Sequence, residues 1–482
     1  MKKRFLSLFL AMTLVFTMLF SGTALAQEQD NSLAESVSSL LDISTWAYDD
    51  LYVGDTYNIY PQTWYLTGMK KPITKAQLRE MIGAIRCKLI NAGCVTAAND
   101  VKYLIKSNMT VKEVLEVFYA MLNSMEFNRD IGISKSGNAL DYMAKTGVFT
   151  GSEGELSLDD ICTVEQACAI ATRLTTYLFD VLDAASKGFL WEIKYGENTA
   201  YLLGSIHAAN YDIYPFSSKM LNAFAKSDVL CVEADILNLS SAETYLKYIY
   251  YTDGSTLKDH VSEETYQKAV EVGAIFGLTE EVVALLKPWY LYLTFSNYLT
   301  TASSNVEELS LAQSLGIDVK FLTDAYLSGK PIVELESVEY QLEVLDSFSD
   351  DLEELLLAIT LEAFYSAGQS NDTILNDVYE MALKYWHDGD VEGFMKDIAP
   401  SLSSSELPEL NEEDEKLLSL LKEYNTKLLT ERDKRMAEKI DQFLKAEGST
   451  TYFIVVGSNH YIGDHSVIDI LKDMGYEINQ IK

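Results

Sequence analysis

The chain has 482 residues, of which 48% are hydrophobic, enough to build two or three domains with cores of their own. Its 72 Asp and Glu residues outnumber the 38 Lys and Arg residues, and the formal net charge is −34 at pH 7. Such a charge repels phosphate backbones, so we expect no nucleic-acid partner. The five cysteines are odd in number and contain no C-x-x-C pair, which argues against a disulfide framework and a zinc ribbon.

The start of the chain is typical of a secretory signal peptide. Residues 2–4 are basic, residues 5–20 are apolar, and residues 24–26 read Ala-Leu-Ala, which fits cleavage at that point. We therefore expect residues 1–26 to be removed and the protein to be secreted and extracellular. No later segment approaches about 18 continuous apolar residues, so we expect no transmembrane span after cleavage.

Residues 27–185 are expected to form a smaller, all-helical module. Three segments in it, 73–90, 109–125 and 162–178, have the pattern of amphipathic helices. Each begins with a Thr that is followed three residues later by Gln or Glu, the signature of a capping box. The pairs are Thr74 and Gln77, Thr110 and Glu113, and Thr163 and Gln166. Their recurrence suggests repeated helical units.

The segments that precede these helices also recur, as DISTWAYDDL at 42–51 and ALDYMAKTGVFTGSEGELSLDD at 139–160. Together they resemble the S-layer homology (SLH) repeat, in which a Trp-Ala helix precedes a glycine turn and a Thr-Arg-Ala-Glu helix start. The resemblance implies association with a cell-wall polymer. The arginine of the repeat is replaced by Lys75, Val111 and Val164, which argues against strong wall anchorage.

Residues 188–482 predict an α/β (α+β) domain with a mixed sheet. Two β-rich runs flank a hairpin at 196–198. A strand at 200–204, a helix at 215–227 and a strand at 229–233 then form a β–α–β unit, in which the two strands are parallel.

The end of the chain repeats this plan with a strand at 451–456, a turn, a helix at 465–475 and a strand at 476–481. Between the two units, at about 236–445, the spacing of apolar residues predicts a large helical insertion.

The tetrad Gly-Ser-x-His occurs twice, at Gly204–His207 and Gly457–His460, each time at the end of a predicted strand. The chain has only five histidines. Because ligands bind outside the carboxyl ends of parallel strands, we expect His207, His460 and Glu233 to meet there. Two imidazoles and a carboxylate bind one divalent metal ion such as Zn²⁺, Mn²⁺ or Co²⁺ and leave a position for an activated water.

The other tetrad residues are assigned supporting roles. Gly204 and Gly457 allow a sharp turn and a close approach to the backbone, and Ser205 and Ser458 are predicted to orient the imidazoles. A nucleophilic serine is disfavoured because neither serine lies in a G-x-S-x-G sequence. A Gly-Ser turn at a strand end is also a common structural feature, so the tetrads alone leave a purely structural explanation open.

An ordered series of motifs in residues 188–482 resembles the TraB/GumN family, whose animal relatives include the Tiki proteases. The series includes YLLGSIH, VEAD, LLKPWYLY, YWHDGDVEGF and VVGSNHYIGDH. The paired G-x-x-H motifs of the family map onto the two tetrads, and its acidic residue after the second strand maps onto Glu233. Its Leu-Glu…Gln element maps onto Leu335, Glu336 and Gln341, and its Arg-Asn pair maps onto Arg432-Asp433, where Asp replaces the Asn.

This resemblance implies a metal-dependent hydrolase, in the first place a metallopeptidase that acts on peptides or proteins at the cell surface. Glu233 is then either a metal ligand or the general base, and Glu336 is the alternative base. Arg432 either stabilises an oxyanion or pairs with Glu336. Two alternatives stay open: a peptide- or pheromone-binding protein without turnover, and a cell-wall-associated protein with an inactive domain.

Overall fold

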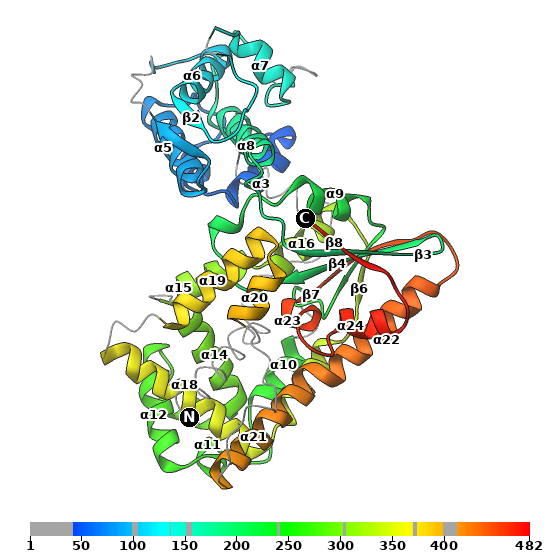
Figure 1. The fold of residues 1–482 in the computed structure, drawn as a ribbon. Helices are drawn as coiled ribbons and strands as arrows, with labels where there is room; N and C mark the ends of the chain where they lie inside the picture. The colour runs from blue at the N-terminus through cyan, green and yellow to red at the C-terminus, as the bar shows by residue number, and fades with distance from the viewer. Residues whose placement is uncertain are drawn as a thin grey trace. The chain divides into compact units, whose positions relative to one another are not determined.

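The computed structural model describes most of the chain and is shown in Figure 1. The described residues are 42–98, 105–134, 136–150, 157–238, 242–301, 305–369, 374–398 and 412–482. They fall into two compact units, one formed by 27–186 with 211–218 and the other by 187–210 with 219–482. The predicted signal peptide lies outside the described residues and stays a prediction.

The N-terminal unit is built mainly from helices. They are α3 (Tyr48–Asp55), α4 (Trp64–Thr67), α5 (Lys75–Asn91), α6 (Val111–Asn123), α7 (Ala139–Lys145) and α8 (Val164–Val181). Helices α5, α6 and α8 each begin with a complete capping box, which confirms all three Thr predictions. In each box the Thr side chain accepts a bond from the third helical N–H, and the Gln or Glu side chain bonds the Thr backbone.

The prediction of an all-helical module is wrong in one respect. Strands β1 (Val95–Ala98) and β2 (Met125–Phe127) form a two-stranded antiparallel sheet between the helices. Val95 and Thr96 are β-branched and favour the extended backbone, but runs of three or four residues are too short to show a period of two. The relation of this unit to SLH repeats stays a prediction.

The second unit contains a mixed sheet, as the sequence predicts. It has six strands in the order β6-β5-β7-β4-β3-β8, and β6 is one that the sequence analysis did not predict. Its strands are β3 (Phe189–Tyr195), β4 (Asn198–Ser205), β5 (Val229–Val232), β6 (Ile332–Glu334), β7 (Thr451–Gly457) and β8 (Ile478–Ile481). Strands β4, β5, β6 and β7 are parallel, and β3 pairs antiparallel with both β4 and β8. The expected parallel orientation of β4 and β5 is confirmed, but β7 lies between them.

The sheet is covered on both faces. Tyr452 and Phe453 are consecutive in β7, so their side chains point to opposite faces. The ring of Phe453 packs against Phe224 and Phe321, with centroids 5.4 and 4.9 Å apart, which places α9 (Ser218–Lys226) and α16 (Ile317–Ser328) on one face. Tyr452 stacks on Phe443 at 4.9 Å, which places α22 (Glu431–Lys445) on the other.

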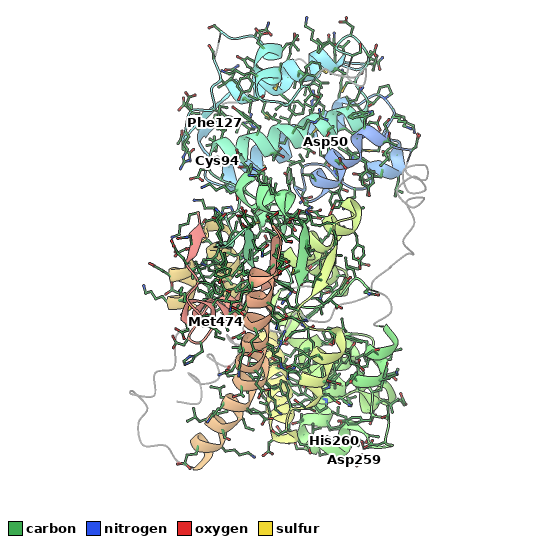
Figure 2. The ribbon with its side chains drawn as sticks, turned by 90° about the vertical axis from the view of Figure 1, so that its right-hand side faces the viewer. Asp50, Cys94, Phe127, Asp259, His260 and Met474 are labelled. Carbon is green, nitrogen blue, oxygen red and sulfur yellow. The ribbon has the colours of Figure 1, made fainter. Side chains whose placement is uncertain are left out.

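The segment between β5 and β7 is largely helical, as predicted, but it also contributes β6 to the edge of the sheet. Besides α16 and α22 it contains α10 (Ala242–Ile249), α11 (Leu257–His260), α12 (Glu263–Ile275), α13 (Glu280–Leu285), α14 (Pro288–Thr300), α15 (Val306–Ser314), α17 (Val338–Asp346), α18 (Asp350–Gln369), α19 (Ile374–Asp388), α20 (Val391–Asp397) and α21 (Glu412–Asn425). A π-helical turn, Thr426–Thr430, joins α21 to α22. Asp259 and His260 mark the helical part of this unit in Figure 2.

Three further features bear on the predictions. All five cysteines are unpaired, and Cys231 is fully buried in β5 as a small apolar side chain. Within the described ranges, no helix combines the length and the apolar character that a membrane crossing requires. At the end of the chain, the predicted turn after β7 is a short helix, α23 (Ser458–Tyr461), followed by α24 (Val467–Asp473).

Candidate active site

The two tetrads lie side by side because β4 and β7 are adjacent parallel strands. In their register Ser205 stands opposite Gly457. The hydroxyl of Ser458 donates a hydrogen bond of 2.9 Å to the carbonyl oxygen of Ser205, which ties the second tetrad to the first. The repeated sequence therefore corresponds to one shared place at the carboxyl edge of the sheet.

The three residues predicted as metal ligands converge on Gly457. A Cβ atom on this glycine would lie 3.2 Å from Glu233 Oε1, 3.4 Å from His207 Nε2 and 3.7 Å from His460 Cδ2. Nε2 of His460 is 3.8 Å from Glu233 Oε1. The backbone N–H of Gly457 donates a 2.6 Å hydrogen bond to the same oxygen. The absent side chain of Gly457 thus leaves a space that two imidazoles and a carboxylate share.

Both imidazoles are held from behind by aspartates. Nδ1 of His207 is 2.6 Å from Asp318 Oδ2, and Nδ1 of His460 is 2.5 Å from Asp433 Oδ1. A carboxylate at Nδ1 places the ring proton there and leaves Nε2 as the basic nitrogen of each ring. Nε2 of His207 lies next to Gly457, and Nε2 of His460 lies next to Glu233 Oε1. This arrangement is typical of histidines that bind metal ions.

The aspartates take the role that the sequence analysis gave to Ser205 and Ser458, so that assignment is corrected. Ser458 donates to a backbone carbonyl, and the hydroxyl of Ser205 has no hydrogen-bond partner within the described residues. Gly204 is needed for the packing of these strands, since a Cβ there would approach Ser458 Cα to 3.2 Å.

Asp318 is the main residue that sequence reasoning missed. It lies 111 positions from His207, so no local spacing connects the two. The contact depends on Gly316, where a Cβ would collide with the carbonyl of His207, and no signal in the sequence alone shows that these two segments meet. Glycine permits this close approach, and Asp318 then enters α16 facing the imidazole.

Arg432 links the two buried glutamates. Its guanidinium contacts Glu233 Oε2 at 2.6 Å and Glu336 Oε2 at 2.7 Å, and the three side chains are 1%, 8% and 2% exposed respectively. Nε of Arg432 also donates to both oxygens of Glu336 at 3.0 and 3.1 Å. Gln341 adds amide hydrogen bonds to Glu233 at 3.0 Å and to Glu336 at 3.2 Å. The pairing of Arg432 with Glu336 foreseen as one alternative is present.

The charges of the site are mutually stabilised. Burial alone would raise the pKa of Glu233, but His460, Arg432 and His207 outweigh it and lower that pKa to about 2. Burial opposes the charging of His207, yet Asp318 more than compensates, and the pKa of this imidazole is raised above its ordinary value. Burial likewise raises the pKa of Asp433, in spite of the neighbouring His460. Glu233 is therefore ionised, which is the form of a carboxyl group that binds a cation.

The donor set suits a divalent ion by type, since it offers two imidazole nitrogens and a carboxylate oxygen. The positions of these side chains, in contrast, do not form a metal-binding geometry. Within the described parts of the chain, no group of three or more His, Cys, Asp or Glu side chains stands in a geometry that could hold a metal ion. Both oxygens of Glu233 are engaged, one by the Gly457 N–H and one by Arg432.

Fold and site together define a class: an α/β protein whose parallel strands present two aspartate-backed imidazoles and a glutamate at their carboxyl edge. The model of the TraB/PrgY/gumN family matches residues 189–480, more than half of the chain. The chain belongs to this family, as its motifs predict.

Similar curated proteins include animal and bacterial ones. Metalloprotease TIKI1 of Danio rerio is 22% identical over 319 residues, covering 60% of this chain and 62% of the relative. The metalloprotease TIKI homolog of Nematostella vectensis is 21% identical over 329 residues, covering 61% and 67%. The uncharacterized protein YbaP of Escherichia coli (strain K12) is 26% identical over 155 residues, covering 32% and 54%. The chain thus spans about half to two thirds of the relatives it matches, and no solved structure matches it.

Proposed function

We propose that this protein is a metal-dependent hydrolase, in the first place a metallopeptidase. The observation that carries the proposal is the convergence of His207, Glu233 and His460 on the space beside Gly457. The similarity to proteins named metalloproteases supports the same reaction class.

His207 and His460 would hold the ion through Nε2, and Glu233 would be the third ligand. A bound Zn²⁺, Mn²⁺ or Co²⁺ supplies Lewis acidity toward a carbonyl and lowers the pKa of a coordinated water. Asp318 and Asp433 keep both rings in the required tautomer. For Glu233 to ligate or to accept a proton, it must give up its bond to the Gly457 N–H or to Arg432.

Glu336 is the weaker candidate for the base. Both of its oxygens accept hydrogen bonds from Arg432, and one also accepts from Gln341. We assign it instead to holding Arg432 in place, so that the guanidinium stays beside Glu233. Arg432 keeps Glu233 ionised and excludes water from behind it, since the arginine is fully buried.

Two neighbouring cavities lie near Glu336 and Arg435, and His207, Glu233 and His460 line neither of them. One cavity of about 510 Å³ is bordered by Glu336, Tyr340 and Arg435, and a second of about 500 Å³ shares Tyr340 and Arg435 with it. Secretion and association with a cell-wall polymer through the N-terminal unit remain predictions.

The test is the metal content and metal affinity of the purified protein beside His207→Ala and His460→Ala. We expect about one divalent ion per chain in the wild type, by analogy with single-metal hydrolases, and its loss in both variants. His465→Asn is the matched control, because His465 is exposed and its φ of 63° suits asparagine. Absence of binding to Zn²⁺, Mn²⁺ and Co²⁺ in the wild type would overturn the proposal.

The engagement of both Glu233 oxygens favours a second candidate, a peptide-binding protein without turnover. In that case His207, Glu233 and His460 serve to stabilise the fold, and peptide binding does not depend on a metal. Peptide binding that persists in a chelator, with no cleavage in any metal, would decide for this candidate.

A further inference from the structure

The N-terminal unit contains a cavity that has no part in the site described above. Its volume is about 520 Å³, and it lies between α3 and the segment that leads into α4. It is lined by aromatic, aliphatic and uncharged polar side chains and by a single carboxylate. These residues are Ile43, Tyr48, Leu51, Tyr52, Asp55, Gln62, Thr63, Tyr65 and Leu66. Neither Lys nor Arg is among them.

One face of α3 supplies the essential groups. Tyr48, Tyr52 and Asp55 follow one another at positions i, i+4 and i+7, so they form a single stripe along the helix. Tyr65, in α4, faces this stripe, and its hydroxyl donates a 2.9 Å hydrogen bond to Asp55 Oδ1. Three tyrosines and one carboxylate therefore line the same cavity, and Tyr65 contacts that carboxylate directly.

Asp55 has no cationic partner in the described part of the chain. Its carboxylate accepts a hydrogen bond from Tyr65, and its other titratable neighbours, Tyr60, Tyr211 and Cys168, are uncharged at neutral pH. Burial raises the pKa of Asp55 to about 6, against the lowering effect of Tyr65. A carboxylate that loses hydration without gaining a cation is costly for the folded protein.

Asp50, in the same helix, shows the contrast. Arg173 contacts the carboxylate of Asp50 at 2.6 Å. Asp50 is labelled in Figure 2. Paired carboxylates of this kind need no further explanation.

The rim of the cavity adds a second unusual feature, because Leu66 is 84% exposed, the highest exposure of a large apolar side chain in the described residues.

We propose that this cavity binds an organic ammonium group, with Asp55 as the counter-ion and the rings of Tyr48, Tyr52 and Tyr65 around its alkyl or methyl substituents. Aromatic faces attract organic cations and also cover their apolar carbon atoms, as in aromatic cages. An anion is excluded by Asp55 and by the lack of basic lining residues. A metal ion is a poor fit, since calcium and magnesium sites use several carboxylate or carbonyl oxygens and the cavity is lined by a single carboxylate.

Two sources offer this chemistry: a quaternary ammonium headgroup and the primary amine of a lysine side chain or amino sugar. The ring-lined wall favours neither by itself, so both are tested. Choline and n-butylammonium serve as the two probes, each titrated into the full chain by isothermal calorimetry and by ligand-observed NMR. The carbon isostere of choline, in which carbon replaces the quaternary nitrogen, is the uncharged control.

We expect at least one ammonium probe to bind and the isostere to bind at least about tenfold more weakly, because it lacks the charge. Asp55→Asn keeps the shape and can still bond Tyr65, yet it should weaken ammonium binding by about tenfold. Tyr48→Leu and Tyr52→Leu should weaken it to a similar degree. Asp50→Asn, on the same helix, should leave the affinity unchanged. Near-UV circular dichroism confirms that each variant is folded.

Failure of both probes to bind the folded wild-type chain overturns the proposal. It is also overturned if the isostere binds as well as choline, or if Asp55→Asn and Asp50→Asn have equal effects. Since the probes contact neither His207 nor His460, this outcome is independent of the metal-binding result.

Discussion

Replacement of Arg432 by methionine tests how the charges of the site are balanced. Arg432 is 1% exposed and makes hydrogen bonds of 2.6 to 3.1 Å to Glu233 and Glu336. Methionine fills a similar volume but leaves two buried carboxylates without their cation. Gln341 and the Gly457 N–H cannot replace it, because amide groups carry no net charge.

The expected loss is large. Removal of one member of a buried ion pair costs about 3–5 kcal/mol of the free energy of unfolding. For a unit of this size, each kcal/mol shifts the melting temperature by about 2–4 °C, so the melting temperature should fall by about 6–20 °C. Arg435→Met, one turn further along α22, is the matched control. Arg435 is exposed and stacks 4.6 Å above the ring of Tyr340, and its loss should cost less than about 1 kcal/mol.

The sign of the pH dependence sharpens the test. In the wild type, the pKa of Glu233 is lowered to about 2, so its contribution to stability is complete above the unfolded pKa and is lost as the pH falls through about 2. Without Arg432, the two buried carboxylates lose the guanidinium that lies between them, so their ionisation costs the folded state more than it does in the wild type. The free energy of unfolding that Arg432→Met loses should therefore be larger at pH 8 than at pH 5.

Melting curves at both pH values, followed by circular dichroism, measure this difference. A second variant, Arg432→Met with Glu336→Gln, removes one of the stranded charges and should regain part of the lost stability. An equal loss at both pH values, together with no recovery in the double variant, would refute the reasoning.

The remaining predictions concern other single groups. Gly457→Ala places a methyl carbon 3.2 Å from Glu233 Oε1, and the φ of −51° at this position suits alanine, so the fold should persist. Metal affinity measured by calorimetry should fall at least about tenfold, and unchanged affinity would contradict the proposed metal site. Asp318→Asn and Asp433→Asn should each lower metal affinity by about 10–100-fold in competition with a chelator, and wild-type affinity in both would remove their positioning role. Burial, with Asp346 and Asp350 nearby, raises the pKa of Glu353 from 4.5 to about 8, so stability should fall as the pH rises between these values. Glu353→Gln should flatten that slope in urea unfolding; an unaltered slope would refute the assignment.

Much of this architecture follows from local chemistry. Thr74, Thr110 and Thr163 predict helix starts because a capping box is completed within four residues. The parallel strands β4 and β5 follow from the β–α–β order and the handedness of such units. The partnership of the two tetrads could be inferred because each ends a parallel strand.

Other features depend on contacts that sequence spacing does not encode. Strand β6 has three residues, too few to show a period, and it is defined by its pairing with β5. Asp318 reaches His207 through the tertiary approach of α16 to the end of β4, which the pattern of α16 alone does not reveal. Asp433 was visible as a departure from the family's Arg-Asn pair, but its bond to His460 required the packing of α22 on the sheet.

The place of β7 between β4 and β5 makes the site a late product of folding. Its strand pairs join segments about 250 residues apart in the chain, as Ser205 and Ser458 show with a separation of 253. Contacts of such high sequence separation close slowly, and until they close β4 and β5 each expose an unpaired edge. A partly folded or truncated chain would therefore carry His207 and Glu233 on separate pieces of sheet. The arrangement of His207, His460 and Glu233 beside Gly457 therefore forms only once β7 lies in place between β4 and β5.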